Sequence, residues 1–385
     1  MSAVTLAGAR VVTPGGVLDP GWVRVDGGLI EAVGPGVPAG SVTDLSGRWV
    51  LPGFVDMHVH GGGGASFTEG GEAQARRAAA FHRAHGSTRL VASLVTAPVD
   101  ELQRRAATLA GLADEGVIDG IHLEGPFLSQ ARCGAQDPRY LVDPDLDVFA
   151  RLRAAARGHL REITIAPELP GATELIRAAV DAGVVAAAGH TDATTEVTAA
   201  AIEAGVTHAT HLFNGMRPLD NRQPGPAGAL MEGDVTCEVI ADGTHLHDVT
   251  IRLVARAAGP GHLVLITDAM GAAGMPDGRY RLGPQEVVVA GGVARLAEGV
   301  PGAGSIAGST ATMAHVVRRA IAEVGLPVTD VAAAASTVPA RILGLGDRTG
   351  ALRPGLAADL VVLDQEFLLT AVMARGEWVP SDTGG

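Results

Sequence analysis

The chain has 385 residues, 47% of them hydrophobic, which is enough to bury the core of one large domain plus a small one. A net charge of −13 argues against a general nucleic-acid-binding protein, because phosphate backbones attract basic surfaces. The apolar stretches are too short and too often interrupted to span a membrane, and two cysteines cannot form a disulfide framework. Since the N-terminus also lacks the pattern of a secretory signal, we expect a cytoplasmic protein.

Residues 1–50 read as short β segments separated by glycine and proline turns, and residues 350–385 show the same pattern. Between them, residues 51–349 alternate apolar runs with alanine-rich helical stretches, which is typical of βαβ units. The predicted strands lie near 54–58, 88–95, 117–123, 162–167, 184–189, 206–210, 235–241 and 262–267. Predicted helices include 72–85, 100–113, 172–182, 194–204, 308–324 and 329–341. This order predicts an α/β fold, a (β/α)8 TIM barrel with a small β-sandwich domain formed from both termini.

Metal-binding and acidic side chains follow six of the eight predicted strands. They are His58, His60, Glu124, His190, His211, Asp242, His245 and Asp268. In such barrels the active site lies at the C-terminal ends of the strands, so these side chains should converge. Imidazole and carboxylate groups suit Zn²⁺ and several other divalent ions. We therefore predict a divalent-metal site with Asp268 as a proton shuttle, the alternative being a buried carboxylate that holds a loop.

Several motifs together resemble the N-acetylglucosamine-6-phosphate deacetylases of the amidohydrolase superfamily. The motifs are PGFVDMHVHG, HLEGPF, GHTDA, THLFNGM, ADGTH, ITDAM, AGS and PGLAADLVVLD. The resemblance implies Glu124, His190 and His211 as ligands of the principal metal, His58 and His60 as ligands of a second, and Asp268 as general acid/base. One or two divalent ions per subunit are expected, with zinc first and iron, manganese, cobalt or cadmium as alternatives.

The same resemblance implies a phosphorylated amino-sugar substrate and a homodimer in which the neighbouring subunit supplies some phosphate contacts. The implied substrate-binding residues are Asn214, the backbone of Gly215, Arg222, His245 and Met313, the last in a segment that covers the sugar. The chain contains no lysine, so no carboxylated lysine can bridge two metals. The family position of Arg222 makes it the expected phosphate anchor in a chain that has no lysine to offer.

One position departs from the family pattern. Where the family usually carries G-A-H-x-P, this chain has CGAQDP, so Gln136 replaces the histidine that polarises the amide carbonyl. Glutamine donates a hydrogen bond but cannot become cationic, which weakens oxyanion stabilisation. The leading prediction is an enzyme that deacetylates N-acetyl-D-glucosamine 6-phosphate to D-glucosamine 6-phosphate and acetate. The alternatives are a deacetylase of N-acetylgalactosamine 6-phosphate or another N-acyl amino sugar, and a sugar-phosphate binder of low activity.

Overall fold

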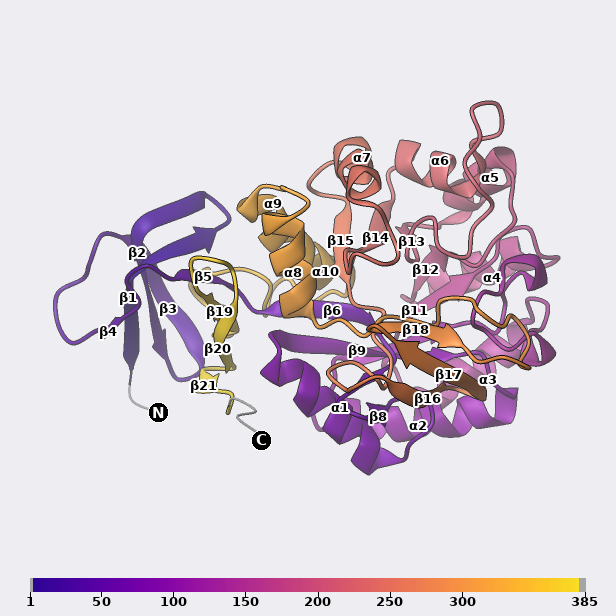
Figure 1. Cartoon of the computed structure of the whole chain (residues 1–385), viewed down its shortest axis with the longest axis horizontal. Coiled ribbons are helices and arrows are strands. Elements are labelled where there is room, and N and C mark those ends of the chain that lie inside the picture. Colours follow the sequence, from indigo (N-terminus) through magenta and orange to yellow (C-terminus); the bar gives the residue numbers. More distant parts are fainter. Residues whose placement is uncertain (1–2, 381–385) are drawn as a thin grey trace. The chain divides into compact units, whose positions relative to one another are not determined.

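The computed structural model describes residues 3–380, and the chain divides into two compact units. One unit comprises Met57–Ala79 and Leu90–Ala311. The other combines segments from both ends of the chain with Ala80–Arg89. Each unit contains its own large sheet (Figure 1).

Eight strands form the barrel sheet in chain order, which confirms the predicted (β/α)8 fold. They are β6 (Phe54–Val59), β9 (Ser87–Val95), β10 (Gly120–Glu124), β11 (Leu160–Ile165), β12 (Val185–Ala188), β13 (His208–Ala209), β14 (Thr236–Ile240) and β15 (Leu263–Ile266). Pairing from β9 to β15 is parallel, and a bridge between Val59 and Ala269 joins the first strand to the last. The strands are buried on both faces and therefore read as nearly continuous apolar runs.

Helices separate the barrel strands and follow the last one. They are α1 (Glu72–Ala84), α2 (Val99–Asp114), α3 (Leu146–Ala155), α4 (Ala172–Asp181), α5 (Thr195–Ala204), α6 (Gly225–Glu232), α7 (Asp248–Ala258), α8 (Met313–Ala322), α9 (Val328–Ala332) and α10 (Val338–Ile342). Polar side chains cap several of them, because Asp145, Thr194 and Thr312 each accept backbone N–H groups of the first turn. The predicted helix 329–341 is interrupted by a π-helical turn at Ala333–Thr337.

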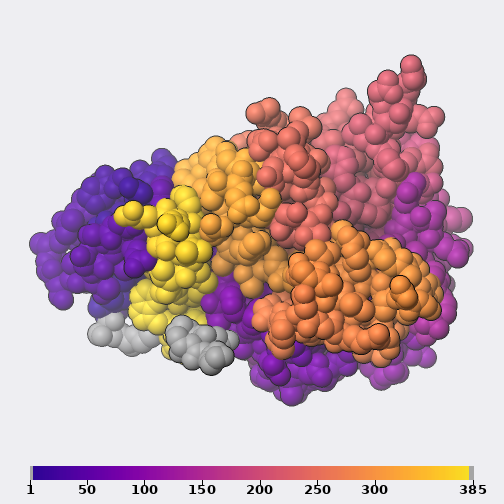
Figure 2. Space-filling model, in the orientation of Figure 1, coloured from indigo at the N-terminus to yellow at the C-terminus, as the bar shows by residue number. Residues whose placement is uncertain are grey.

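A small antiparallel sheet follows β15 and was not predicted from the sequence. Its strands are β16 (Gly278–Leu282), β17 (Gln285–Ala290) and β18 (Val293–Leu296). Alternate residues of β17 are buried, and the sheet shares a hydrophobic cluster with Val95 and Met270 of the barrel unit. Figure 2 shows this segment as a continuous part of the unit's surface on the face in view. One of its side chains, Leu282, lines the cavity described below.

The two termini share one sheet of eight strands, as the matching β patterns predicted. Its strands are β1 (Val4–Thr13), β2 (Gly16–Asp26), β3 (Leu29–Pro35), β4 (Thr43–Asp44), β5 (Trp49–Pro52), β19 (Leu360–Leu363), β20 (Leu369–Ala374) and β21 (Glu377–Trp378). Antiparallel pairing of β5 with β19 links the N-terminal strands to the C-terminal ones. Hydrogen bonds thus join all eight strands, around a core that includes Leu6, Val50 and Leu360.

Membrane insertion by a helix has no support in the structure. Within residues 3–380, no helix is both long and apolar enough to cross a bilayer.

Candidate active site

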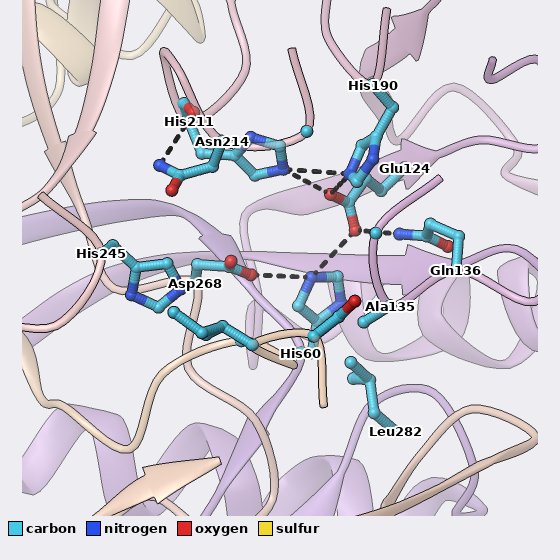
Figure 3. A pocket seen from close by; sticks show the side chains of 15 residues that line it. His60, Glu124, Ala135, Gln136, His190, His211, Asn214, His245, Asp268 and Leu282 are labelled. Carbon is cyan, nitrogen blue, oxygen red and sulfur yellow. Dashed lines mark hydrogen bonds and ion pairs between the residues drawn. The ribbon is translucent and has the colours of Figure 1, made fainter. Parts of the chain in front are cut away.

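Side chains from the ends of several barrel strands meet in a cavity of about 280 Å³ (Figure 3). Nine residues named from the sequence line it: His60, Glu124, Gln136, His190, His211, Asn214, Gly215, His245 and Asp268. His58 is fully buried and lies beside His60, with the two Nε2 atoms 3.2 Å apart. The expected convergence of these side chains at one end of the barrel is therefore present in the structure.

Glu124, His190 and His211 form the first group of side chains that could hold a metal ion. Glu124 Oε1 lies 2.9 Å from His190 Nε2 and 2.9 Å from His211 Nε2, and the two Nε2 atoms are 3.1 Å apart. All three side chains are buried, and their donor atoms face a common point. Three donors at such separations, with a cavity beside them, are typical of a catalytic metal site that leaves a position open.

His58, His60 and Asp268 form a second group next to the first. Asp268 Oδ1 lies 3.1 Å from His60 Nε2 and 3.6 Å from His58 Nε2. The two groups are close neighbours, because His60 Nε2 also lies 3.2 Å from Glu124 Oε2. The arrangement offers two adjacent positions for divalent ions.

Hydrogen bonds at the outer ring nitrogens, Nδ1, leave the inner nitrogens, Nε2, able to bind a metal. His190 Nδ1 lies 2.9 Å from the carbonyl oxygen of Arg132, and His60 Nδ1 lies 3.2 Å from that of Ser93. A carbonyl oxygen only accepts, so each Nδ1 donates and the Nε2 of a neutral ring presents a lone pair. These lone pairs face the carboxylate oxygens of the site. A divalent ion can replace the protons that otherwise lie between such acceptors, so the donor set fits a divalent metal.

Both carboxylates of the site are held in the ionised form. Burial alone would raise the pKa of Glu124, but contacts with His190 and His211 help to hold it well below its ordinary value. Burial would also raise the pKa of Asp268, yet attraction to His58 and His60 lowers it. Both carboxylates are therefore ionised and available as ligands or bases.

Three site residues adopt backbone conformations that are uncommon for side chains other than glycine. The φ angles are 46° at His190, 27° at His211 and 48° at Asp268. Such residues cost about 1–3 kcal/mol each and persist where surrounding contacts determine them. At Asp268 these contacts are explicit, because its N–H donates to the carbonyl of His58 and its carbonyl accepts from Ser309 N–H. The closing contacts of the barrel thus aim the Asp268 side chain.

Gln136 contacts a metal donor directly, which the sequence did not reveal. Its Nε2 donates to Glu124 Oε2 at 2.6 Å, and its Oε1 accepts the N–H of Thr96 at 2.7 Å. The bond to Glu124 is visible in Figure 3, and together the two bonds fix the amide and orient the Glu124 carboxylate. Gln136 therefore holds the metal ligand in place while also lining the cavity.

Removing the Gln136 side chain is expected to weaken metal binding. Groups that orient a metal ligand typically contribute about 10- to 100-fold in affinity, so Gln136→Ala should raise the metal Kd by that factor. Gln136→His keeps a possible donor towards Glu124 and should retain more affinity than the alanine variant. Competition with a chromophoric chelator measures both values. Equal affinities for the wild type and Gln136→Ala would contradict this role.

Glu238 is a second residue near the metal donors that sequence reasoning missed. It lies fully buried in β14, where its Oε2 accepts from His58 Nδ1 at 3.0 Å and from the backbone N–H of His211 at 2.9 Å. One carboxylate therefore orients residues of both metal groups. The only signal in the sequence is an acidic residue inside the apolar run TCEVI.

The remaining lining residues suit a polar ligand. Asn214 Nδ2 donates to the carbonyl of His211 at 3.2 Å, which leaves its Oδ1 to face other groups. Gly215 has φ 61°, and a Cβ there would approach His190 Nδ1 to 2.8 Å, so a larger residue would disturb a metal donor. His245 Nδ1 is 2.8 Å from Asp242 Oδ2.

Two residues named from the sequence lie outside this cavity. Arg222 is exposed and lines a separate depression of about 380 Å³ together with Arg217 and Thr194. Met313 is fully buried in the first turn of α8, because its side chain joins that helix's buried face, and it does not line the cavity. Leu282 of β16 and Ile306 do line the cavity. Leu282 was not identified from the sequence because its strand was not.

Comparison with known proteins agrees with the fold. Residues 49–379 match the model of the amidohydrolase family. The chain therefore belongs to the amidohydrolase family, whose members are hydrolases. Within that family it groups with the N-acetylglucosamine-6-phosphate deacetylases, which confirms the resemblance inferred from the motifs.

Three relatives illustrate this grouping. An N-acetylglucosamine-6-phosphate deacetylase from Bacillus subtilis (strain 168) is 34% identical over 379 residues, which cover 95% of this chain and 94% of the relative. An N-acetylgalactosamine-6-phosphate deacetylase from Escherichia coli O157:H7 is 34% identical over 377 residues, with 97% and 98% covered. The structure of N-acetyl-D-glucosamine-6-phosphate deacetylase from Mycobacterium smegmatis aligns with a TM-score of 0.93 and 49% identity, with 98% and 100% covered.

Proposed function

We propose that this chain hydrolyses the acetamide of N-acetyl-D-glucosamine 6-phosphate and releases acetate and D-glucosamine 6-phosphate. The observation that carries the proposal is the donor group Glu124, His190 and His211 beside the ionised Asp268 in one cavity. Relatives that span nearly the whole chain bear the name of this activity.

A divalent metal is the proposed cofactor. Glu124, His190 and His211 would hold the principal ion, and His58 and His60 with Asp268 would hold a second one. We expect zinc, because nitrogen and oxygen donors in a small buried group suit it, with iron, manganese, cobalt or cadmium as alternatives. When bound, the ion would lower the pKa of a water molecule and polarise the acetamide carbonyl.

Asp268 is the proposed proton carrier of the reaction. Its ionised carboxylate accepts a proton from the attacking water as the water oxygen bonds to the carbonyl carbon. It then returns that proton to the amide nitrogen, the C–N bond breaks, and the amine leaves while acetate keeps the water oxygen. Gln136 carries a second amide N–H besides the one donated to Glu124, and we assign it to the developing negative charge on the carbonyl oxygen.

The phosphate is proposed to bind at Asn214, the backbone of Gly215 and His245, all of which line the cavity. Arg222 is exposed and lines a different depression, so its proposed phosphate contact is to the cavity of a second copy within a homodimer. In that arrangement the guanidinium supplies a bidentate contact to phosphate oxygens. We place the enzyme in the cytoplasm because Cys133 and Cys237 are both free.

The direct test is release of acetate and amine from N-acetylglucosamine 6-phosphate by the metal-loaded enzyme. N-acetylgalactosamine 6-phosphate is the necessary comparison, since one relative of equal identity is named for that substrate. Unphosphorylated N-acetylglucosamine reports the phosphate preference, which Arg222→Ala should abolish. Binding of the sugar phosphate without release of amine would contradict the proposal and favour a binding protein.

The proposed phosphate contact at His245 predicts a pH dependence. Burial would lower the pKa of His245, but the hydrogen bond with Asp242 raises it above its ordinary value. Below this raised pKa the imidazolium attracts phosphate, and above it the positive charge is lost. KM for the phosphorylated substrate should therefore rise as pH increases through the pKa of His245.

Asp242→Asn removes the carboxylate and should move this rise in KM to lower pH. Profiles of KM against pH for the wild type and the variant measure the shift. KM for the unphosphorylated sugar is the control and should lack this inflection. Superimposable profiles for the two enzymes would disprove the assigned role of the pair.

A further inference from the structure

A third group of potential metal donors lies inside the barrel, apart from the residues that line the cavity. It consists of Glu162 in β11, His208 in β13 and Glu238 in β14. All three side chains are fully buried, and one donor atom from each lies within 4.8 Å of the others. Neither the family motifs nor the proposed reaction uses Glu162 or His208.

The hydrogen bond at His208 Nδ1 determines whether His208 Nε2 has a lone pair available for a metal ion. His208 Nδ1 lies 2.6 Å from Thr236 Oγ1, and that hydroxyl donates its own hydrogen to the carbonyl of Thr207 at 3.0 Å. The hydroxyl must therefore accept from His208, so Nδ1 carries the hydrogen. The Nε2 of the neutral ring then presents a lone pair towards the two carboxylates.

The carboxylate oxygens of Glu162 and Glu238 near His208 Nε2 also present lone pairs and no hydrogens. His208 Nε2 is 3.2 Å from Glu238 Oε1 and 3.8 Å from Glu162 Oε1. The other oxygen of Glu238 is already used by His58 and by the backbone of His211. Among residues 3–380, neither oxygen of Glu162 has a hydrogen-bond partner. Glu238 Oε1 and His208 Nε2 also lack one, because their 3.2 Å separation does not have the angles of a hydrogen bond.

A single proton does not satisfy this group. Burial lowers the pKa of His208, but Glu162 and Glu238 raise it above its ordinary value, and a proton on His208 Nε2 serves Glu238 Oε1 at 3.2 Å while both oxygens of Glu162 stay without a partner in the described chain. Burial also raises the pKa of Glu162 to about 8, but a proton on Glu162 finds no acceptor at hydrogen-bond distance there. One water has two hydrogens to give to four acceptor atoms and leaves the carboxylate charge uncompensated. A divalent ion neutralises both carboxylates. Ligand atoms about 2.1 Å from one ion stand roughly 3–4 Å apart, which agrees with the two separations from His208 Nε2.

We propose that Glu162, His208 and Glu238 bind a divalent transition-metal ion inside the barrel, separate from the catalytic metals. The imidazole ligand favours an ion such as Zn²⁺, Mn²⁺ or Fe²⁺ over Mg²⁺ or Ca²⁺. The hydrogen bond from His208 to Thr236 fixes the ring as metal-bound histidines require. Because Glu238 also accepts from His58 and His211, this ion lies one carboxylate away from the ligands of the catalytic site.

Anomalous diffraction from crystals of the full-length, metal-loaded protein locates the ion directly. Data should be collected above and below the X-ray absorption edges of zinc, iron and manganese. The anomalous difference map above the edge of the bound element should show a peak at bonding distance from the three side chains. A peak at Glu124, His190 and His211 in the same map shows that the crystal is metal-loaded. A peak at that position alone, or a water between Glu162 and His208, overturns the proposal, whereas an interior peak supports it even if no deacetylase activity is found.

Metal content in solution provides the second test. Glu162→Gln retains the shape of the side chain but removes its charge, so the purified variant should contain one metal equivalent per chain less than the wild type. Glu69→Gln is the matched control, because Glu69 is a partly buried carboxylate of the same unit outside all three donor groups. Equal metal content in the wild type, Glu162→Gln and Glu69→Gln overturns the proposal.

Discussion

Asp268→Asn is expected to reduce kcat by about 10²- to 10⁴-fold, the usual contribution of a positioned general acid/base. Asparagine has nearly the same shape but cannot accept the proton of the attacking water or return it to the amine. The backbone of residue 268 is held by bonds to His58 and Ser309, so the loop should keep its conformation. Steady-state acetate release gives kcat, and calorimetric titration with the sugar phosphate should show that binding persists.

Two controls separate proton transfer from other effects of this substitution. Asp268 contacts His60, so the metal content of Asp268→Asn must be measured, and activity should stay low when the metal is saturating. Asp242→Asn makes the same chemical change at another cluster of the site and should alter KM more than kcat. Wild-type turnover in Asp268→Asn would rule out its role as the proton carrier.

Glu124→Gln is expected to lower kcat/KM by about 10³-fold, since a catalytic metal contributes several kcal/mol to transition-state stabilisation. Glu124 is the one donor that contacts both His190 and His211, so loss of its charge should weaken binding of the principal ion most. Metal analysis should show a lower content after dialysis, and high metal concentrations should restore activity only in part.

Loss of metal must be distinguished from loss of fold in this variant. Circular dichroism and thermal unfolding of Glu124→Gln should show a folded protein, because the substitution preserves volume in a packed site. Glu69→Gln serves again as the matched control and should keep both metal and activity. Full metal content together with wild-type kcat/KM in Glu124→Gln would refute the assignment of the principal site.

The fold could be predicted largely from the sequence because its repeating pattern is local. Strand-like apolar runs, alanine-rich helices and similar β patterns at both ends each occupy short stretches of chain, and all eight barrel strands lie where they were expected. The sheet of β16–β18 was missed because its strands lie outside the alternation of strands and helices, and because its hydrophobic partners lie far away in the sequence.

The convergence of these polar side chains could be predicted for a related reason. Parallel barrel strands end at the same rim, so polar residues at strand ends must approach one another once the barrel closes. This general geometry brings Glu124, His190 and His211 together without any knowledge of individual contacts. It does not say which hydrogen bonds surround them. The partners of Gln136 and the positive φ angles depend on loops whose paths the sequence does not disclose.

By itself, therefore, the sequence determined the barrel, the polar side chains that follow six of its eight strands, and the family to which the chain belongs. Only the tertiary structure decided that Gln136 donates a hydrogen bond to Glu124 and that Arg222 lies outside the cavity. It also decided that Glu162, His208 and Glu238 lie together in the interior. The physical reason is that both faces of a barrel strand are buried. Inward and outward residues then look alike in the sequence, and strand stagger, not spacing along the chain, decides which of them touch.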